Sequence, residues 1–83
     1  LETITPNPAT NNVEISYKLN QAGGSAYLMI IGYYGSNGTS NNYILDVNSN
    51  AINLNINNYP SGFYTVALVV NGEIVDAKTL IKQ

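Results

Sequence analysis

The sequence predicts an all-β fold, an immunoglobulin-like β-sandwich of about seven antiparallel strands. Three observations lead to this prediction. Apolar and polar residues alternate with a period of two along much of the chain, turn signals recur roughly every 8–12 residues, and no window combines helical periodicity with capping residues. A chain of 83 residues is the size of one domain.

The N-terminal half predicts three strands and one long loop. Residues 1–5 can add a first edge strand, and Pro6-Asn7-Pro8 is expected to run extended, because proline fixes φ and restricts the preceding residue. Residues 13–19 alternate between apolar and polar side chains, which predicts a half-buried strand. Residues 25–32 form a continuous apolar run of strand length. Residues 32–42, with the sequence GYYGSNGTSNN, indicate a long flexible loop.

The C-terminal half predicts four more strands. A short strand is expected at residues 43–47, and a half-buried one at residues 52–56, where asparagine alternates with isoleucine and leucine. Residues 63–70 are apolar on both faces, which predicts a central strand covered on both sides. Residues 74–81 close the chain as a strand whose broken alternation indicates a bulge.

The turn chemistry agrees with this division into strands. Tyr59-Pro60-Ser61-Gly62 suits a type I turn, with proline at its second position. Asn71-Gly72 between two apolar strands predicts a type I′ hairpin. Tyr64 stands just after a turn at the start of a late strand, where immunoglobulin-like domains place a tyrosine corner.

Composition excludes several classes of partner. The net charge is −2, with only three basic residues, so no basic patch exists to bind nucleic acid or an anionic membrane surface. No run approaches the roughly 18 apolar residues of a membrane span, so membrane insertion is not expected. The chain has no cysteine, which leaves the cellular compartment open.

The chain also lacks the residues that most catalytic and metal sites need. Without histidine or cysteine, nucleophile activation and zinc binding lose their usual groups. Lysine remains as a possible base, but Lys18, Lys78 and Lys82 are expected on solvated strand faces, as are the five acidic residues. The stretch 46–50, DVNSN, lacks the glycine and the distal glutamate of a calcium loop. We therefore predict no catalytic residues, no cofactor, no metal and no enzymatic activity.

Aromatic residues leave one alternative function open. Tyr33 and Tyr34 lie beside a glycine-rich segment and could form an exposed surface that stacks a sugar ligand. Strand tyrosines also commonly pack in sandwich cores. The alternative function is therefore a carbohydrate-binding or adhesion module of a surface enzyme.

One strand predicts an apolar outer surface. If Ala26 and Leu28 face the core, then Tyr27, Met29 and Ile31 face outward. Such a face is typical of a surface that contacts a partner or a neighbouring domain. Burial on both faces of a central strand would explain the same pattern.

Three segments together resemble a known family. They are ITPNPATNNVEISYKL at residues 4–19, INLNINNYPSGFYTVALVVNG at residues 52–72, and KTLIKQ at residues 78–83. The order and content of these segments resemble the type A C-terminal sorting domain of proteins exported by the type IX (Por) secretion system of Bacteroidetes. The residues that carry the resemblance are Pro6, Asn7, Pro8, Pro60, Gly62, Tyr64, Lys78, Leu80, Ile81 and Lys82.

The resemblance implies a non-enzymatic secretion signal. Such a domain follows a larger N-terminal cargo domain, is recognised in the periplasm by the type IX translocon, and directs the cargo across the outer membrane to the cell surface or the medium. A surface sortase then removes it. The implied division is 1–8 as the end of a linker and an extended leading segment, and 9–83 as the sorting domain. An exposed final strand would suit recognition by strand addition.

Overall fold

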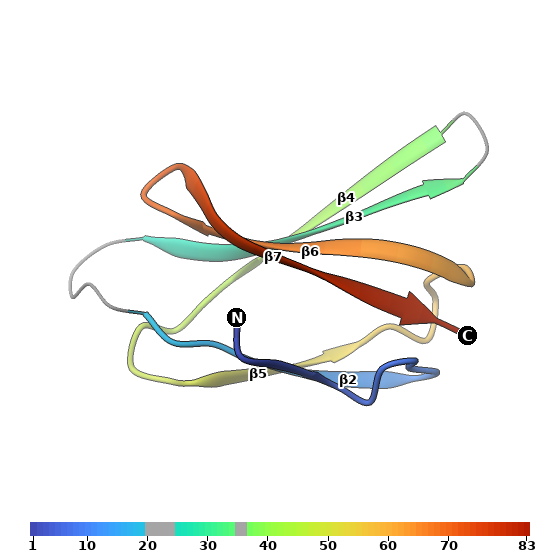
Figure 1. Cartoon of the computed structure of the whole chain (residues 1–83), viewed down its shortest axis with the longest axis horizontal. Coiled ribbons are helices and arrows are strands. Elements are labelled where there is room, and N and C mark those ends of the chain that lie inside the picture. Colours follow the sequence, from blue (N-terminus) through green and yellow to red (C-terminus); the bar gives the residue numbers. More distant parts are fainter. Residues whose placement is uncertain (20–24, 35–36) are drawn as a thin grey trace.

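The structure, a computed structural model, describes residues 1–19, 25–34 and 37–83, with the backbone alone at 33, 34 and 37–39. This part of the chain forms seven strands and no helix. The strands make two antiparallel sheets that pack face to face as a β-sandwich (Figure 1). Their bounds are β1 (Thr3–Thr5), β2 (Asn12–Ser16), β3 (Ala26–Tyr34), β4 (Asn37–Ile44), β5 (Ala51–Asn55), β6 (Gly62–Val70) and β7 (Glu73–Lys82).

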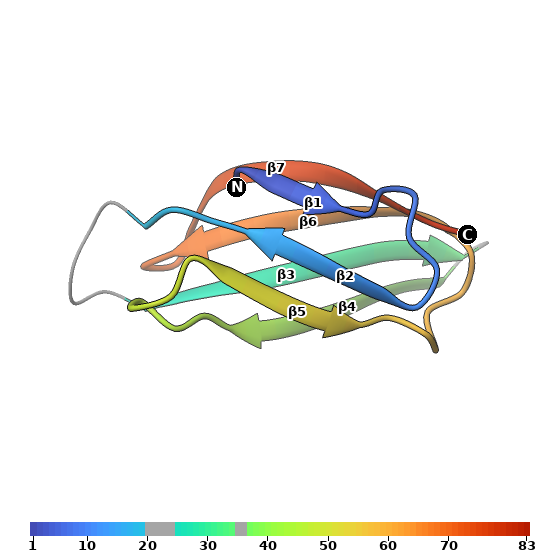
Figure 2. The ribbon, with the colours of Figure 1, turned by 90° about the horizontal axis from the view of Figure 1, so that it is seen from below.

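The order of the strands matches the predicted sandwich. One sheet has the order β1-β2-β5 and the other β4-β3-β6-β7 (Figure 2). This is an immunoglobulin-like arrangement in which the fourth strand pairs with the third. Strand β1 lies at a sheet edge, as predicted, and pairs with β2 from Thr3↔Ser16 to Thr5↔Glu14.

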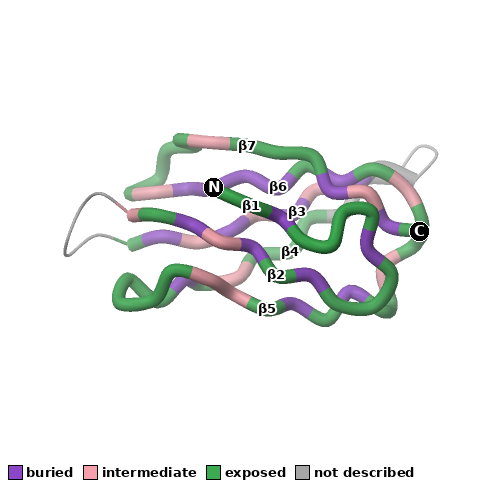
Figure 3. Tube along the Cα trace, turned by 60° about the horizontal axis from the view of Figure 1, so that its bottom comes forward, coloured by how far each residue is buried: buried purple, intermediate pink, exposed green. Residues whose placement is uncertain are grey.

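The core lies between the two sheets. Buried and exposed residues alternate along β2 and β5, so that each presents one apolar face inward (Figure 3). Strands β3 and β6 present Leu28, Ile30, Val66 and Leu68 from the opposite side, and each is at most 2% exposed. The predicted alternation of apolar and polar residues is therefore confirmed for β2 and β5. Within the described ranges, no helix is long and apolar enough to cross a bilayer.

The hairpin between β6 and β7 follows the predicted geometry. Asn71 and Gly72 have φ values of 52° and 85°, the positive values that a type I′ turn requires. The predicted bulge is also present. Leu68 pairs with Asp76 while Val69 pairs with Ile74, so Val75 is the extra residue on β7.

The prediction of a long loop at residues 32–42 was wrong. Residues 32–34 complete β3, and β4 pairs with β3 from Tyr34↔Asn37 to Tyr27↔Ile44. Residues 35–36 lie outside the described ranges. The strand predicted at residues 43–47 ends at Ile44. Strand β4 lies at a sheet edge and is held there by backbone hydrogen bonds to β3. A strand in this position can form with few apolar side chains.

The leading segment also differs from its prediction. Residues 6–8 bend instead of running extended, and the peptide bonds before Pro6 and Pro8 are both cis. The chain thereby passes from the three-stranded sheet to the edge of the other sheet, where Ala9 forms a parallel bridge with Lys82. Contacts with β7, described below, hold the segment in this bent path.

Strand β6 is central, and part of it is buried on both faces. It lies between β3 and β7, and its inner face packs in the core. On its outer face Phe63 is 71% exposed, although Ala67 and Val69 are each 2% exposed. The predicted burial on both faces is therefore confirmed for residues 66–69 and was wrong at Phe63 and Thr65, whose side chains are exposed on the outer face.

Candidate functional site

The three motifs that carry the family resemblance meet at one end of the sandwich. Strand β7 brings Leu80 opposite Tyr64, and Lys82 opposite Gly62. The bent segment 6–9 lies along the other edge of β7. We call this region the C-terminal corner, comprising residues 6–9, 60–64 and 78–83. Segments more than 70 residues apart in the chain, such as Asn7 and Thr79, are in contact there.

Asn7 pairs with β7 as a strand residue would. Its side-chain amide nitrogen donates to the carbonyl oxygen of Thr79 at 2.9 Å, and its side-chain oxygen accepts from the amide of Ile81 at 2.9 Å. Ala9 continues the pairing, since its amide donates to Ile81 O at 2.8 Å and its carbonyl accepts from Gln83 N at 2.9 Å. Asn7 and Ala9 therefore occupy the outer edge of β7 from Thr79 to Gln83.

This arrangement contradicts the expectation of an exposed final strand. An edge can receive an added strand only through unpaired backbone groups, and these groups of Ile81 are already bonded. The roles of Ala9 and Thr79 were missed in the sequence. Neither residue type marks a binding site, and period-two patterns carry no information on contacts between distant segments. The Asn-Pro pair at Asn7 signals only a turn.

The motif residues divide into a buried and an exposed group. Tyr64, Leu80 and Lys82 are buried, at 2%, 0% and 9% exposure. Gly62 and Ile81 are half-buried, and the exposed members are Pro6, Asn7, Pro8, Pro60 and Lys78. The buried residues build the corner, so only the exposed ones are freely available for direct contact.

Lys82 was predicted on a solvated face, and this prediction was wrong. Its register with Gly62 turns the side chain inward, where the apolar stem can pack while the polar end is bonded. The ammonium group donates to the carbonyl oxygen of Gln83 at 2.9 Å. Lys78 is exposed, as predicted.

Tyr64 forms the predicted tyrosine corner. Its hydroxyl donates to the carbonyl oxygen of Pro60 at 2.5 Å, four residues upstream. Its ring lies 5.3 Å from that of Tyr59, whose hydroxyl is hydrogen-bonded to the hydroxyl of Tyr43. The amide of Tyr59 closes a turn onto Ile56 O at 2.9 Å, so a hydrogen-bonded turn precedes Pro60.

Replacing Tyr64 by phenylalanine should lower the free energy of unfolding by about 1 kcal/mol, because the carbonyl of Pro60 loses its donor. Urea denaturation of the purified domain measures the change. Tyr27→Phe is the matched control, since Tyr27 is only half-buried on the outer face of β3. Equal effects of the two substitutions would contradict a special role for the corner bond.

A further contact joins the start of the chain to β7. The backbone nitrogen of Leu1 lies 2.8 Å from Oδ2 of Asp76 and donates a hydrogen bond to it. This hydrogen bond, together with one from the amide of Ala77, holds the pKa of Asp76 below its ordinary value. The N-terminal segment therefore contacts β7 near its middle as well as at its end.

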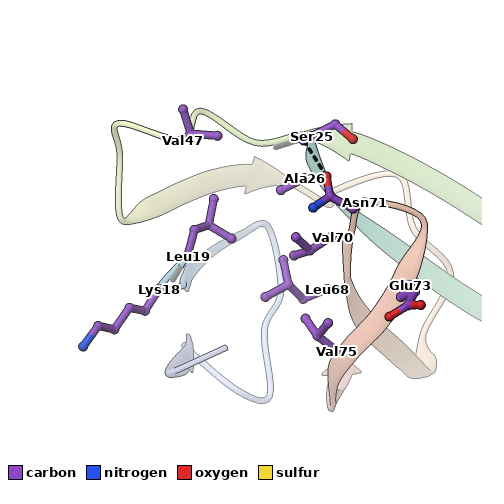
Figure 4. A pocket seen from close by; sticks show the side chains of 10 residues that line it. All are labelled: Lys18, Leu19, Ser25, Ala26, Val47, Leu68, Val70, Asn71, Glu73 and Val75. Carbon is purple, nitrogen blue, oxygen red and sulfur yellow. Dashed lines mark hydrogen bonds between the residues drawn. The ribbon is translucent and has the colours of Figure 1, made fainter. Parts of the chain in front are cut away.

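A cavity of about 280 Å³ opens between the sheets at the hairpin end, and Figure 4 shows its lining. Most of the lining is apolar, and the ammonium group of Lys18 points away from the cavity (Figure 4). Asn71 accepts a hydrogen bond from the amide of Ser25 at 3.2 Å at its margin. No nucleophile paired with a base lines it among the described residues, and none of the predicted site residues does.

Two other sequence-based candidates have different outcomes. The side chains of Tyr33 and Tyr34 lie outside the described structure, so the sugar-stacking surface has no structural support. In the DVNSN stretch, Asp46 accepts a hydrogen bond from the amide of Asn48 at 2.8 Å, which makes it a turn residue. In the part of the chain that the structure describes, no group of three His, Cys, Asp or Glu residues is placed to hold a metal.

Comparison with protein families gives a match that covers residues 3–83. It is to the secretion system C-terminal sorting domain. Comparison with curated proteins and with solved structures gave no match. The matched residues include every motif of the C-terminal corner and both sheets of the sandwich. The chain belongs to the secretion system C-terminal sorting domain family and is a C-terminal signal for type IX secretion.

Proposed function

We propose that this domain works without catalysis, as a folded surface that the type IX translocon recognises once the cargo has reached the periplasm. A surface sortase then removes the domain and joins the cargo to anionic lipopolysaccharide. Family membership supports the broader part of this mechanism, which is contact with the type IX machinery and export of a larger protein to the surface or the medium.

The convergence of the three family motifs in one corner supports recognition of a folded domain. Gly62 pairs with Lys82, Tyr64 pairs with Leu80, and Asn7 bonds to the same strand. An unfolded chain would present these residues far apart. We therefore assign direct contact with the translocon to the exposed motif residues, and assign the buried ones to holding the corner together.

The packing of β1 bears on where the sortase cuts. Strand β1 pairs with β2 through residues 3–5, and Asn7 is bonded to β7. Cleavage upstream of Thr3 would leave these contacts intact. The boundary between a linker at 1–8 and a domain at 9–83 remains a prediction, and we place the cleavage site N-terminal to it.

A secretion assay tests the proposal. Residues 1–83 are fused behind a periplasm-targeted fluorescent protein and expressed in a Bacteroidetes strain with a working type IX system, and in its translocon mutant. We expect fluorescence at the surface or in the medium in the first strain, and periplasmic fluorescence in the mutant. Retention in the periplasm of both strains would contradict the proposal.

A further inference from the structure

The two outer faces of the sandwich differ sharply in chemistry. The outer face of β1-β2-β5 is polar. By register it carries Thr3, Thr5, Asn12, Glu14, Ser16, Ala51, Asn53 and Asn55. The outer face of β4-β3-β6-β7, which we call the apolar face, carries Tyr27, Met29, Ile31, Ser40, Asn42, Ile44, Phe63, Thr65, Ala67, Val69, Ile74, Ala77, Thr79 and Ile81.

The apolar face has no charged side chain. The chain has three basic and five acidic residues, and all of them lie elsewhere. The charged residues of β7 pair with the positions of β6 that face inward, so the register places their side chains on the inner side of the sheet. These pairs are Glu73↔Val70, Asp76↔Leu68, Lys78↔Val66 and Lys82↔Gly62. The outer side of β7 therefore carries no charged side chain.

Large apolar side chains on this face are open to solvent. Ile44 is 88% exposed, Phe63 is 71% exposed and Ile74 is 61% exposed. The pairings Ile44↔Tyr27, Tyr27↔Val69 and Val69↔Ile74 place one apolar row across all four strands. Ile44 and Ile74 at the ends of this row are exposed, Tyr27 is half-buried and Val69 is only 2% exposed, so the two end residues supply most of the exposed surface of the row. Met29, Ile31 and Ile81 are half-buried on the same face, and accessible apolar side chains that gather on one face mark an interaction surface.

We propose that the apolar face is the surface that docks on a protein of the type IX machinery, through an apolar and uncharged complementary patch. This inference rests on the proposed function. It adds a second contact region, because Ile44, Tyr27 and Ile74 are accessible and lie outside the C-terminal corner.

The charge of the apolar face and the direction of the chain favour a protein of the type IX machinery over a lipid surface and over the cargo. A lipid surface is expected to engage Lys or Arg beside the inserted apolar residues, and this face has none. The cargo precedes Leu1, which lies between the two layers (Figure 1), and β1 belongs to the opposite sheet. The chain toward the cargo therefore leaves the sandwich away from the apolar face.

The test uses the fluorescent fusion with paired substitutions. Ile44→Lys with Ile74→Lys places two charges on the apolar face at exposed positions outside the C-terminal corner, where folding should tolerate them. The matched control, Asn12→Lys with Asn53→Lys, places the same charges on the polar face. We expect export of the first variant to fall at least 10-fold, and export of the control to stay within 2-fold of the parent. Thermal unfolding of each purified domain verifies the fold.

The outcomes separate this inference from the proposed function. If the parent fusion itself is not exported, the proposed function fails. If the parent and the Ile44/Ile74 variant are exported equally, only the docking surface is wrong. Two further results would also overturn it. One is a parent dimer in sedimentation that this variant breaks, and the other is parent binding to phosphatidylethanolamine–phosphatidylglycerol vesicles that it abolishes.

Discussion

Replacement of Leu80 by alanine should lower the free energy of unfolding by about 3 kcal/mol, which is a large share of the stability of a domain of this size. Leu80 is fully buried, belongs to the core cluster and pairs with Tyr64. Truncation leaves a cavity where β7 packs against the rest of the sandwich. Urea denaturation measures the effect as a lower midpoint with an unchanged slope.

Val75→Ala provides the control for this substitution. Val75 lies on the same strand, is the extra residue of the bulge and is 57% exposed, so its truncation should cost well under 1 kcal/mol. A cost below 1 kcal/mol for Leu80→Ala would show that β7 is dispensable for the core.

The result also guides deletion experiments. Removing Thr79–Gln83 takes Leu80 with it, so loss of export would report unfolding as much as lost recognition.

Replacement of Asn7 by alanine should lower the free energy of unfolding by about 2 kcal/mol, because two hydrogen bonds to β7 are lost together. The local effect is more specific. The amide of Ile81 loses its acceptor and becomes open to water, so its hydrogen exchange should accelerate toward that of an exposed amide. Exchange measured by NMR on the purified domain reports this change residue by residue.

Asn53→Ala is the matched control for Asn7→Ala. Asn53 is an exposed asparagine on β5, and its truncation should leave both stability and Ile81 exchange close to the parent values. Unchanged exchange at Ile81 in Asn7→Ala would mean that other contacts protect this edge of β7.

Features that depend on neighbouring residues could be predicted from the sequence. The Asn71-Gly72 turn, the bulge in β7 and the tyrosine corner each arise within a few residues of one another, and all three are present. The alternation in β2 and β5 follows directly from one buried face.

Features that depend on distant partners could not be predicted in this way. Strand β4 has a loop-like composition, yet it pairs with β3 along its whole length. Asn7 finds its partners in Thr79 and Ile81, more than 70 residues away. The family resemblance named the right motifs in the C-terminal corner, but only the fold shows that they are in contact.

The parallel pairing of Ala9 with Lys82 has a mechanical consequence. A pull on the two ends of the chain draws these neighbouring segments in opposite directions along their common axis. The hydrogen bonds from Ala9 to Ile81 and from Gln83 to Ala9 are then loaded together in shear, whereas a hairpin pulled at its open end breaks its bonds one at a time. If the cargo pulled on one end of the domain and the translocon held the other, the force would load these bonds in shear. The sandwich would then resist unfolding more strongly than a hairpin opened from its end.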